Sequence, residues 1–266
     1  MRPGSGKDGE RPLRGKALFL FDLDGVFYKG KESRVKLGGT VAVRELRSLG
    51  KKIFVLTNNS TDSVETIRSR LEDFDVQVRE EEILTSGLLT ADYLRRRHGR
   101  STYFLVGERG LEAEMKKAGH SRVDEGADFV VVGLDRHLTY WELDKAARLA
   151  RSGARIVATH DSRLYMSDTG PAMATGPIVR ALEFASGRRA TVIGKPSPLM
   201  FKMALELARC DRRDAVMVGD QLDTDCLGAQ RAGVDFVLVK TGVDQSAQGK
   251  RVVAVLGNVD ALVDLL

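Results

Sequence analysis

Short apolar runs that alternate with amphipathic segments constrain the fold more than any other feature of this sequence. Ala17–Phe21 is an almost continuous apolar run, which is typical of a strand buried on both faces of a parallel sheet. Lys52–Thr57 has the same character, and a helix expected at Val41–Leu49 lies between the two runs and ends at Gly50. The alternation predicts an α/β fold with a largely parallel sheet.

A second α/β set begins near Leu84 and interrupts the first. Its expected elements are strands at Tyr103–Val106, Phe129–Val132 and Arg155–Thr159 and helices at Leu111–Ala118, from Thr139 onward and at Ile178–Ser186. The spacing of Thr139 and Glu142 is that of a capping box. The first pattern then resumes with strands at Thr191–Ile193, Ala215–Val218 and Phe236–Val239 and helices at Pro198–Arg209 and near Asp225–Ala232. We therefore expect one domain at 16–83 and 190–266 and a second, inserted domain at 84–189.

The charge of the chain does not indicate a nucleic-acid-binding protein. Three of its five net positive charges lie in residues 1–16, so the rest of the chain is close to balanced. Residues 1–15 are polar and Gly-rich, which predicts a disordered tail with no secretory signal. No apolar stretch approaches the roughly 18–20 residues that span a bilayer. Two cysteines, Cys210 and Cys226, suit a reducing compartment. We expect a cytoplasmic protein with no nucleic-acid or membrane partner.

Acidic residues directly follow two of the expected strands. Asp22 and Asp24 follow the first strand in FDLDGV, and Asp220, Asp223 and Asp225 follow another in VMVGDQLDTD. In an open α/β sheet, ligands bind outside the carboxyl ends of the strands, so the two groups could converge there. Carboxylates that converge repel one another unless a cation holds them, and hard oxygen ligands suit Mg²⁺.

The polar ends of two further strands predict a phosphate site. Thr57, Asn58 and Asn59 end the second strand and precede a helix, so their hydroxyl and backbone N–H groups can hold an anion. Lys195 follows the strand at Thr191–Ile193 and supplies a point charge suited to phosphate. Each feature alone is more simply a turn, a helix cap or a surface lysine. Their joint occurrence, each directly after an apolar run, favours phosphoryl transfer.

FDLDGV, LTNNS, GKPSP and GDQLDTD together resemble the four motifs of the haloacid dehalogenase (HAD) phosphohydrolase superfamily. The resemblance is closest to the NagD-like branch, which includes p-nitrophenyl, phosphoglycolate and pyridoxal phosphatases. It implies a Rossmann-like core with a parallel sheet and an α/β cap domain of the C2 type, inserted between the second and third motifs. The second α/β set lies at that place in the chain.

The resemblance also implies a chemistry, the Mg²⁺-dependent hydrolysis of small phosphate monoesters. Asp22 would be the nucleophile that forms an aspartyl-phosphate, and Asp24 the general acid and base. Mg²⁺ would be bound by Asp22, the backbone carbonyl of Asp24 and Asp220, with Asp225 supporting the metal site.

The remaining motif residues would bind the substrate. Thr57 and the backbone of Asn58 would hold the phosphoryl oxygens, with Asn59 as a further substrate contact. Lys195 would offset the charge on Asp22 and on the transferring group.

The cap departs from the pattern of the branch. The segment ATHDSRLYMSDTG resembles a substrate loop that often reads ATNPD, but His160, Asp161 and Ser162 replace the usual Asn-Pro-Asp. His160, Arg163 and Tyr165 are candidates for contact with the leaving group, and plain surface positions explain them equally well. The departure leaves open which small phosphorylated metabolite is the substrate.

Two alternatives share these motifs. A phosphotransferase or mutase would use the same nucleophile, but the mutases of the superfamily have a helical cap soon after the first motif. The segment between Asp24 and Thr57 leaves no room for such a cap. A non-catalytic phosphate-binding module is disfavoured because both Asp22 and Asp24 are present. The branch also implies a possible homodimer through the cap.

Overall fold

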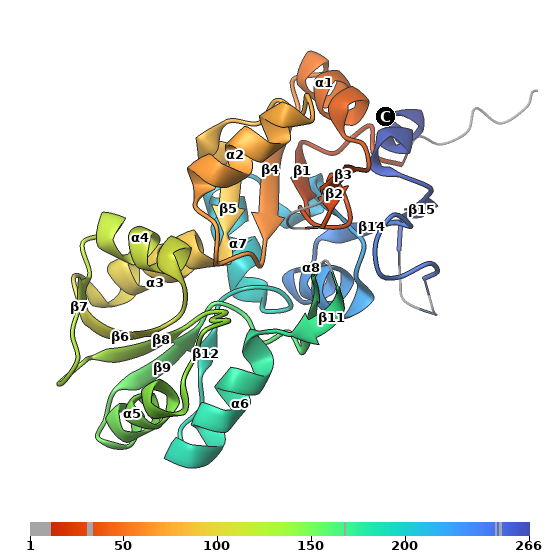
Figure 1. Cartoon of the computed structure of the whole chain (residues 1–266). Coiled ribbons are helices and arrows are strands. Elements are labelled where there is room, and N and C mark those ends of the chain that lie inside the picture. Colours follow the sequence, from red (N-terminus) through yellow and green to blue (C-terminus); the bar gives the residue numbers. More distant parts are fainter. Residues whose placement is uncertain (1–11, 31–33, 168, 248, 250–251) are drawn as a thin grey trace, which may run out of the picture.

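The chain folds into two parallel sheets, each covered by helices on both faces (Figure 1). The structure is a computed structural model that describes residues 12–30, 34–167, 169–247, 249 and 252–266. It confirms the predicted α/β class, with a Rossmann-like first sheet and a second, smaller α/β unit.

The first sheet has six parallel strands in the order β15-β14-β13-β1-β4-β5. These strands are β1 (Leu18–Phe21), β4 (Lys52–Thr57), β5 (Ile83–Thr85), β13 (Ala215–Gly219), β14 (Asp235–Val239) and β15 (Ala254–Leu256). β1 lies between β13 and β4, and every residue of β1 and β13 is buried. Burial on both faces explains why these strands are continuous apolar runs. The carboxyl ends of β1, β4 and β13 meet at one edge of the sheet.

The second sheet has five parallel strands in the order β12-β9-β8-β6-β7. They are β6 (Thr102–Val106), β7 (Ser121–Arg122), β8 (Phe129–Val132), β9 (Arg155–Ala158) and β12 (Thr191–Val192). The strand expected at Thr191–Ile193 was assigned to the first domain, and this placement is wrong. Its residues pair with Val157 and Ala158 of β9, because the chain passes along the edge of the second sheet before it enters the first. Where the chain leaves the first domain for the second, β5 still belongs to the first sheet. The domain boundary predicted at residue 84 therefore falls inside a strand.

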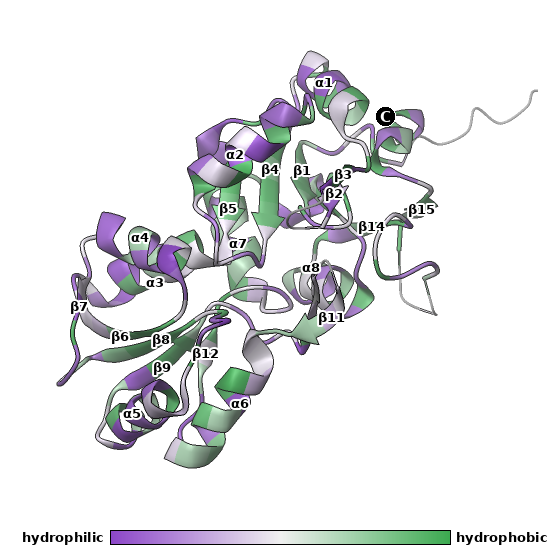
Figure 2. Ribbon diagram, in the orientation of Figure 1, coloured by the Kyte–Doolittle hydropathy of each residue, from purple (hydrophilic) through white to green (hydrophobic). Residues whose placement is uncertain are grey.

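Three apolar clusters hold the layers together. One face of the first sheet packs on α1 (Thr40–Ser48) and α2 (Val64–Asp73). The other face packs on α7 (Pro198–Ala208) and α8 (Leu227–Ala232) in a cluster that continues through α3 (Ser86–His98) and α4 (Arg109–Lys117) to the second sheet. The far face of the second sheet packs on α5 (Tyr140–Arg151) and α6 (Thr175–Ser186). The helices α3, α4, α5 and α6 are the cap helices. Figure 2 shows the strands of both sheets mostly green, whereas α1, α2 and α4 carry purple segments.

Local signals set several helix ends as predicted. Thr139 and Glu142 form the capping box at the start of α5, where each backbone N–H donates to the other side chain. Gly187 ends α6 in a left-handed conformation with φ 69°, which glycine adopts without steric cost. The helix expected near Asp225–Ala232 begins instead as a π-helical turn at Leu222–Cys226 and continues as α8.

Two antiparallel hairpins were not predicted, since strands this short give too little alternation to be recognised. They are β2 (Tyr28–Lys29) with β3 (Val35–Lys36), and β10 (Leu164–Ser167) with β11 (Gly170–Met173). Residues 12–15 of the predicted tail form a turn in which Leu13 is buried and its N–H donates to the Leu265 carbonyl. The rest of that tail, residues 1–11, lies outside the described residues. Among the described residues, no helix combines the length and apolarity needed to cross a membrane.

Candidate active site

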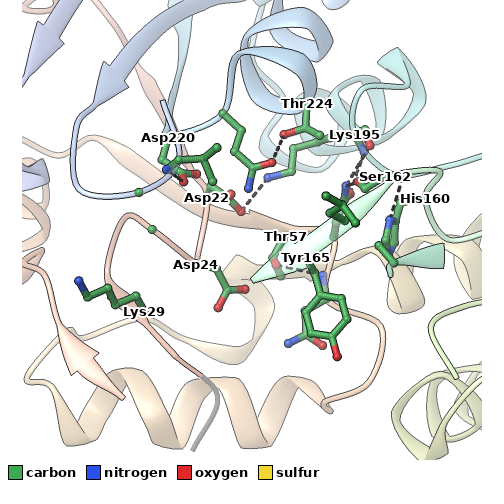
Figure 3. A pocket seen from close by; sticks show the side chains of 18 of the residues that line it. Asp22, Asp24, Lys29, Thr57, His160, Ser162, Tyr165, Lys195, Asp220 and Thr224 are labelled. Carbon is green, nitrogen blue, oxygen red and sulfur yellow. Dashed lines mark hydrogen bonds and ion pairs between the residues drawn. The ribbon is translucent and has the colours of Figure 1, made fainter. Parts of the chain in front are cut away.

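A cavity of about 640 Å³ opens at the carboxyl edge of the first sheet, between that sheet and the cap. Its floor consists of residues that follow β1, β4 and β13, and its outer wall comes from the cap and the two hairpins (Figure 3). The predicted site residues on its surface are Asp22, Asp24, Thr57, Asn58, Asn59, His160, Tyr165, Lys195 and Asp220. The structure thus brings together residues that the sequence separates by almost 200 positions.

Asp22 and Lys195 form an ion pair at the floor of the cavity. Asp22 follows β1 directly, and its Oδ1 atom lies 2.7 Å from Lys195 Nζ and accepts a 2.8 Å hydrogen bond from the Leu23 N–H. Both side chains are almost completely buried. Burial by itself lowers the pKa of Lys195, but the charges of Asp22 and Asp225 reverse the shift and raise the pKa above its ordinary value. Lys195 is therefore a fixed positive charge beside Asp22.

Asp220 is held by the loop that follows β14. Its Oδ2 accepts a 2.8 Å hydrogen bond from the Val243 N–H, and its carbonyl accepts one from the Asp244 N–H. Gly25, with φ +80°, and Gly242 both lie so close to this carboxylate that a side chain at either position would overlap it. This loop was not predicted, because nothing in residues 240–244 resembles a motif by itself.

Asp225 does not line the cavity, unlike Asp22 and Asp220. It is fully buried, its Oδ1 lies 2.7 Å from Lys195 Nζ, and its Oδ2 accepts a hydrogen bond from the Gln221 N–H. Both of its oxygens are thus engaged with protein groups. The support role predicted for Asp225 stays a prediction, and these contacts show the atoms through which it would act.

The residues present fit a divalent cation. Carboxylate oxygens of Asp22, Asp220 and Asp225 lie within 4.8 Å of one another, and Asp220 Oδ1 is buried without a hydrogen-bond partner among the described residues. Burial, reinforced by the neighbouring carboxylates, raises the pKa values of Asp220 and Asp225. A cation at this point would offset that repulsion and supply the missing partner of Asp220.

Asp24 and Thr57 face the cavity from neighbouring strand ends. Asp24 is exposed, and its backbone forms an isolated β-bridge with Tyr28 at the start of the first hairpin. Figure 3 shows Asp24 two residues beyond Asp22, extending into the cavity on the side where Tyr165 lies. Thr57 ends β4, is buried, and accepts a hydrogen bond from the Asn59 N–H at its Oγ1.

The side chains of Asn58 and Asn59 are both engaged with protein. Asn58 contacts the backbone of Lys195 through both ends of its amide. Asn59 accepts hydrogen bonds from the N–H groups of Thr61 and Asp62 and donates to the Asp62 carboxylate, which stabilises the turn before α2. The prediction that these residues bind substrate therefore concerns their backbone groups and not the contacts of their side chains.

The three predicted cap residues lie in different surroundings. His160 is buried, its Nδ1 accepts from the Ser162 N–H, and its Nε2 lies 3.0 Å from Thr175 Oγ1. Burial, with a smaller contribution from Lys195, lowers the pKa of His160 to about 4. Tyr165 lies on β10 and faces the cavity, whereas Arg163 is exposed and lies outside the cavity lining that the described residues form (Figure 3).

Further lining residues were not singled out from the sequence. On the outer wall, the apolar ones are Val35 and Leu164 of the hairpins, Leu134 of the loop after β8 and Ala174 at the start of α6, and the polar ones include Ser162 and Ser167. Lys29 and Gly30 of the first hairpin also border the cavity. Only the topology, which places both hairpins over the sheet edge, identifies them.

Comparison with known proteins gives consistent matches along the chain. A family model for haloacid dehalogenase-like hydrolases matches residues 19–121, and a HAD-hydrolase-like model matches residues 192–264. The chain is 32% identical to an acid sugar phosphatase of Staphylococcus haemolyticus over 226 residues, 85% of each protein. It is 31% identical to the 5′-nucleotidase YutF of Bacillus subtilis, over 85% of this chain and 87% of that protein. The p-nitrophenyl phosphatase structure from Archaeoglobus fulgidus is 35% identical, with a TM-score of 0.88 over 94% of this chain and 99% of the other.

Proposed function

The chain belongs to the haloacid dehalogenase-like hydrolases and is a phosphatase of their NagD-like branch, and from this premise we propose that it hydrolyses small phosphate monoesters through an aspartyl-phosphate on Asp22. The observation that carries the proposal is the Asp22 carboxylate at the floor of the cavity, with the Lys195 ammonium 2.7 Å away. A carboxylate held at a strand end beside a fixed positive charge is suited to attack an anionic phosphoryl group.

Asp22 attacks the phosphorus atom, and the bond to the ester oxygen breaks. Asp24, exposed in the cavity two residues further along, protonates the departing alkoxide. Asp24 then takes a proton from the water that hydrolyses the aspartyl-phosphate, which regenerates Asp22 and releases inorganic phosphate. Thr57 and the backbone N–H groups that follow β4 hold the phosphoryl oxygens.

Lys195 acts throughout as a fixed positive charge. Its pKa is raised by Asp22 and Asp225, so it stays protonated while negative charge moves from the Asp22 carboxylate to the departing ester oxygen and returns to Asp22 when the aspartyl-phosphate is hydrolysed. Burial at the floor of the cavity strengthens this interaction, because the charges are not screened by water.

Mg²⁺ is the cofactor that we propose for the acidic cluster. Asp22, Asp220 and the Asp24 carbonyl would hold it, and Asp225 would support the site. When bound, Mg²⁺ would neutralise part of the charge on Asp22 and on the phosphoryl group, which allows the two anions to approach. The buried, unpaired Asp220 Oδ1 supports this assignment.

The proposed substrates are small phosphorylated metabolites. A cavity of about 640 Å³ suits a sugar phosphate, a mononucleotide or p-nitrophenyl phosphate, and the cap above it would exclude phosphoproteins. The acid sugar phosphatase and the 5′-nucleotidase among the relatives act on substrates of this size class by their names. We further propose that the protein acts in the cytoplasm and that the cap is the surface of a homodimer.

Asp22→Asn tests the mechanism, because the amide keeps the shape of the side chain and removes the nucleophile. We expect the variant to fold normally, judged by circular dichroism, and to release no phosphate from p-nitrophenyl phosphate. Activity close to that of the unsubstituted protein would refute the assignment of Asp22.

A further inference from the structure

Lys195 reaches the floor of the first sheet from the edge of the second. β12 pairs with β9, and this pairing continues as the N–H groups of Ile193 and Gly194 donate to the carbonyls of Ala158 and Thr159 at 3.0 and 2.7 Å. The next residue is Lys195, whose ammonium lies 2.7 Å from Asp22. A charge required at the floor of the cavity is therefore attached to the sheet of the cap, and any shift of the cap sheet would tend to move it.

Asn58 holds the backbone of Lys195 from the opposite side. Its Oδ1 accepts a 2.9 Å hydrogen bond from the Lys195 N–H, and its Nδ2 donates a 2.9 Å hydrogen bond to the Lys195 carbonyl. One side-chain amide thus satisfies both backbone polar groups of Lys195, and the orientation of the amide follows from these two partners. The same Nδ2 lies 3.4 Å from the hydroxyl of Ser162 in the cap.

The backbone of Asn58 is held at the edge of the first sheet. Asn58 follows β4 directly, and its own carbonyl accepts a 2.8 Å hydrogen bond from Ser86 Oγ at the start of α3. Gly194 allows the close approach, since a Cβ atom there would lie 2.5 Å from Asn58 Oδ1. The contact between Asn58 and the Lys195 segment therefore requires an amide on one side and a glycine on the other.

We propose that Asn58 is a positioning residue for the phosphatase reaction: its side chain fixes the backbone of Lys195 to the first sheet, so that the ammonium stays beside Asp22 when the cap moves. It acts through Lys195 and not on the phosphoryl group, although its backbone N–H is a candidate phosphate contact. The inference rests on the proposed function, in which Lys195 supplies the positive charge of the site.

A double-mutant cycle of Asn58→Ala and Lys195→Ala tests the proposal. We expect Asn58→Ala to lower kcat about 100-fold, as a displacement of roughly 1 Å at a reacting centre does, with KM changed less than about threefold. In the Lys195→Ala background, the same substitution should lower kcat less than about threefold, because the group that it positions is gone. Hydrolysis of p-nitrophenyl phosphate under single-turnover conditions gives the rates.

The binding of inorganic phosphate gives a second readout that needs no turnover. Titration calorimetry in the presence of Mg²⁺ should show weaker phosphate binding for Asn58→Ala than for the unsubstituted protein, and no further weakening in Lys195→Ala. Asn58→Asp keeps the size of the side chain and the acceptor for the Lys195 N–H, but it replaces the donor by an oxygen atom and adds a negative charge. It serves as the second variant if the alanine variant does not fold. The loss of activity that Asn58→Asp causes through displacement of Lys195 should also disappear in the Lys195→Ala background.

Asn59→Ala is the matched control, since Asn59 lies next in the chain and its side chain forms hydrogen bonds within its own turn, to Thr61 and Asp62. The factor by which Asn59→Ala changes kcat should be the same in the unsubstituted protein and in the Lys195→Ala background. Equal losses from Asn58→Ala in both backgrounds would overturn the positioning role. An unimpaired Lys195→Ala variant would instead remove the role proposed for Lys195, and the Asp22→Asn experiment would remain an independent test of the nucleophile.

Discussion

The loop after β14 allows a test of the metal site in which no proposed ligand is changed. Gly242 lies against Asp220, and a Cβ atom at this position would lie 2.7 Å from the Cβ of Asp220 and closer still to its carboxylate. Non-bonded carbon atoms approach no closer than about 3.5 Å without repulsion. The φ of Gly242 lies outside the left-handed region, so Gly242→Ala strains no torsion and acts only by displacing Asp220 or the loop.

The displacement breaks the support of a proposed ligand. The Val243 N–H donates a 2.8 Å hydrogen bond to Asp220 Oδ2, and a shift of about 1 Å would lose it. Loss of a group that orients a metal ligand typically costs about 10- to 100-fold in metal affinity, or roughly 1.4–2.8 kcal/mol. We expect Gly242→Ala to raise the Mg²⁺ concentration for half-maximal hydrolysis of p-nitrophenyl phosphate by this factor.

Gly257→Ala is the control, because no atom lies within 4 Å of a Cβ atom at that position. It should leave both the Mg²⁺ requirement and the melting temperature unchanged. Titration calorimetry with Mg²⁺ measures the affinity directly and separates it from effects on turnover. A Mg²⁺ affinity of Gly242→Ala within about twofold of the unsubstituted protein would refute Asp220 as a ligand in this geometry.

Four further predictions concern the chemistry and the cap. Asp24→Asn should lower kcat/KM about 10²- to 10⁴-fold for an alkyl phosphate but less for p-nitrophenyl phosphate, whose leaving group needs little protonation; equal losses would argue against Asp24 as the acid. Chelator treatment should abolish activity, Mg²⁺ should restore it, and excess Ca²⁺ should inhibit, since Ca²⁺ accepts more ligands and could chelate Asp22; full activity after chelation would contradict a metal site. The pKa of His160, about 4, lies below the ordinary 6.5, so the unfolded chain binds the proton more readily and the free energy of unfolding falls as the pH falls from 6.5 toward 4. His160→Gln should remove roughly 1–2 kcal/mol of this loss between pH 6.5 and pH 5. The free energies of unfolding come from urea unfolding curves, and the same loss between the two pH values with and without the substitution would contradict the prediction. Tyr165→Phe and Tyr165→Ala should change the order of kcat/KM values across a panel of phosphate esters, whereas Arg163→Ala should not. Of these two residues, Tyr165 lines the cavity that the described residues form and Arg163 does not.

The floor of the site was predictable from the sequence because it follows from strand ends. A strand buried on both faces is an apolar run, and the first polar residue after the run must lie at the edge of the sheet. Asp22 after β1, Thr57 at the end of β4 and Asp220 after β13 are found in this way without knowledge of the strand order. The parallel pairing of β1 with both neighbours then brings them together.

The same reasoning misplaced β12 and missed the outer wall of the cavity. Thr191 and Val192 are only half buried, at the edge of the second sheet, and a two-residue edge strand has no pattern that reveals its partner. The hairpins bordering the cavity have strands of only two or four residues, and Gly242 acts by the absence of a side chain. Features of this kind depend on contacts between distant segments, which local periodicity does not encode.

The geometry divides the site into two parts that can vary separately. The charged floor lies mainly at the edge of the first sheet and carries the proposed chemistry, whereas the wall belongs to the cap and the hairpins, mixes apolar and polar side chains, and would face the leaving group. Substitutions in the wall can change the preferred ester without disturbing the nucleophile, which agrees with a cap loop that departs from the pattern of the branch while the four motifs remain. Lys195 is the exception, since its backbone continues the cap sheet and its ammonium lies in the floor. The Asn58 amide stands at the junction where β12 leads into Lys195, and its proposed role is to keep a change in the cap from reaching the reacting atoms.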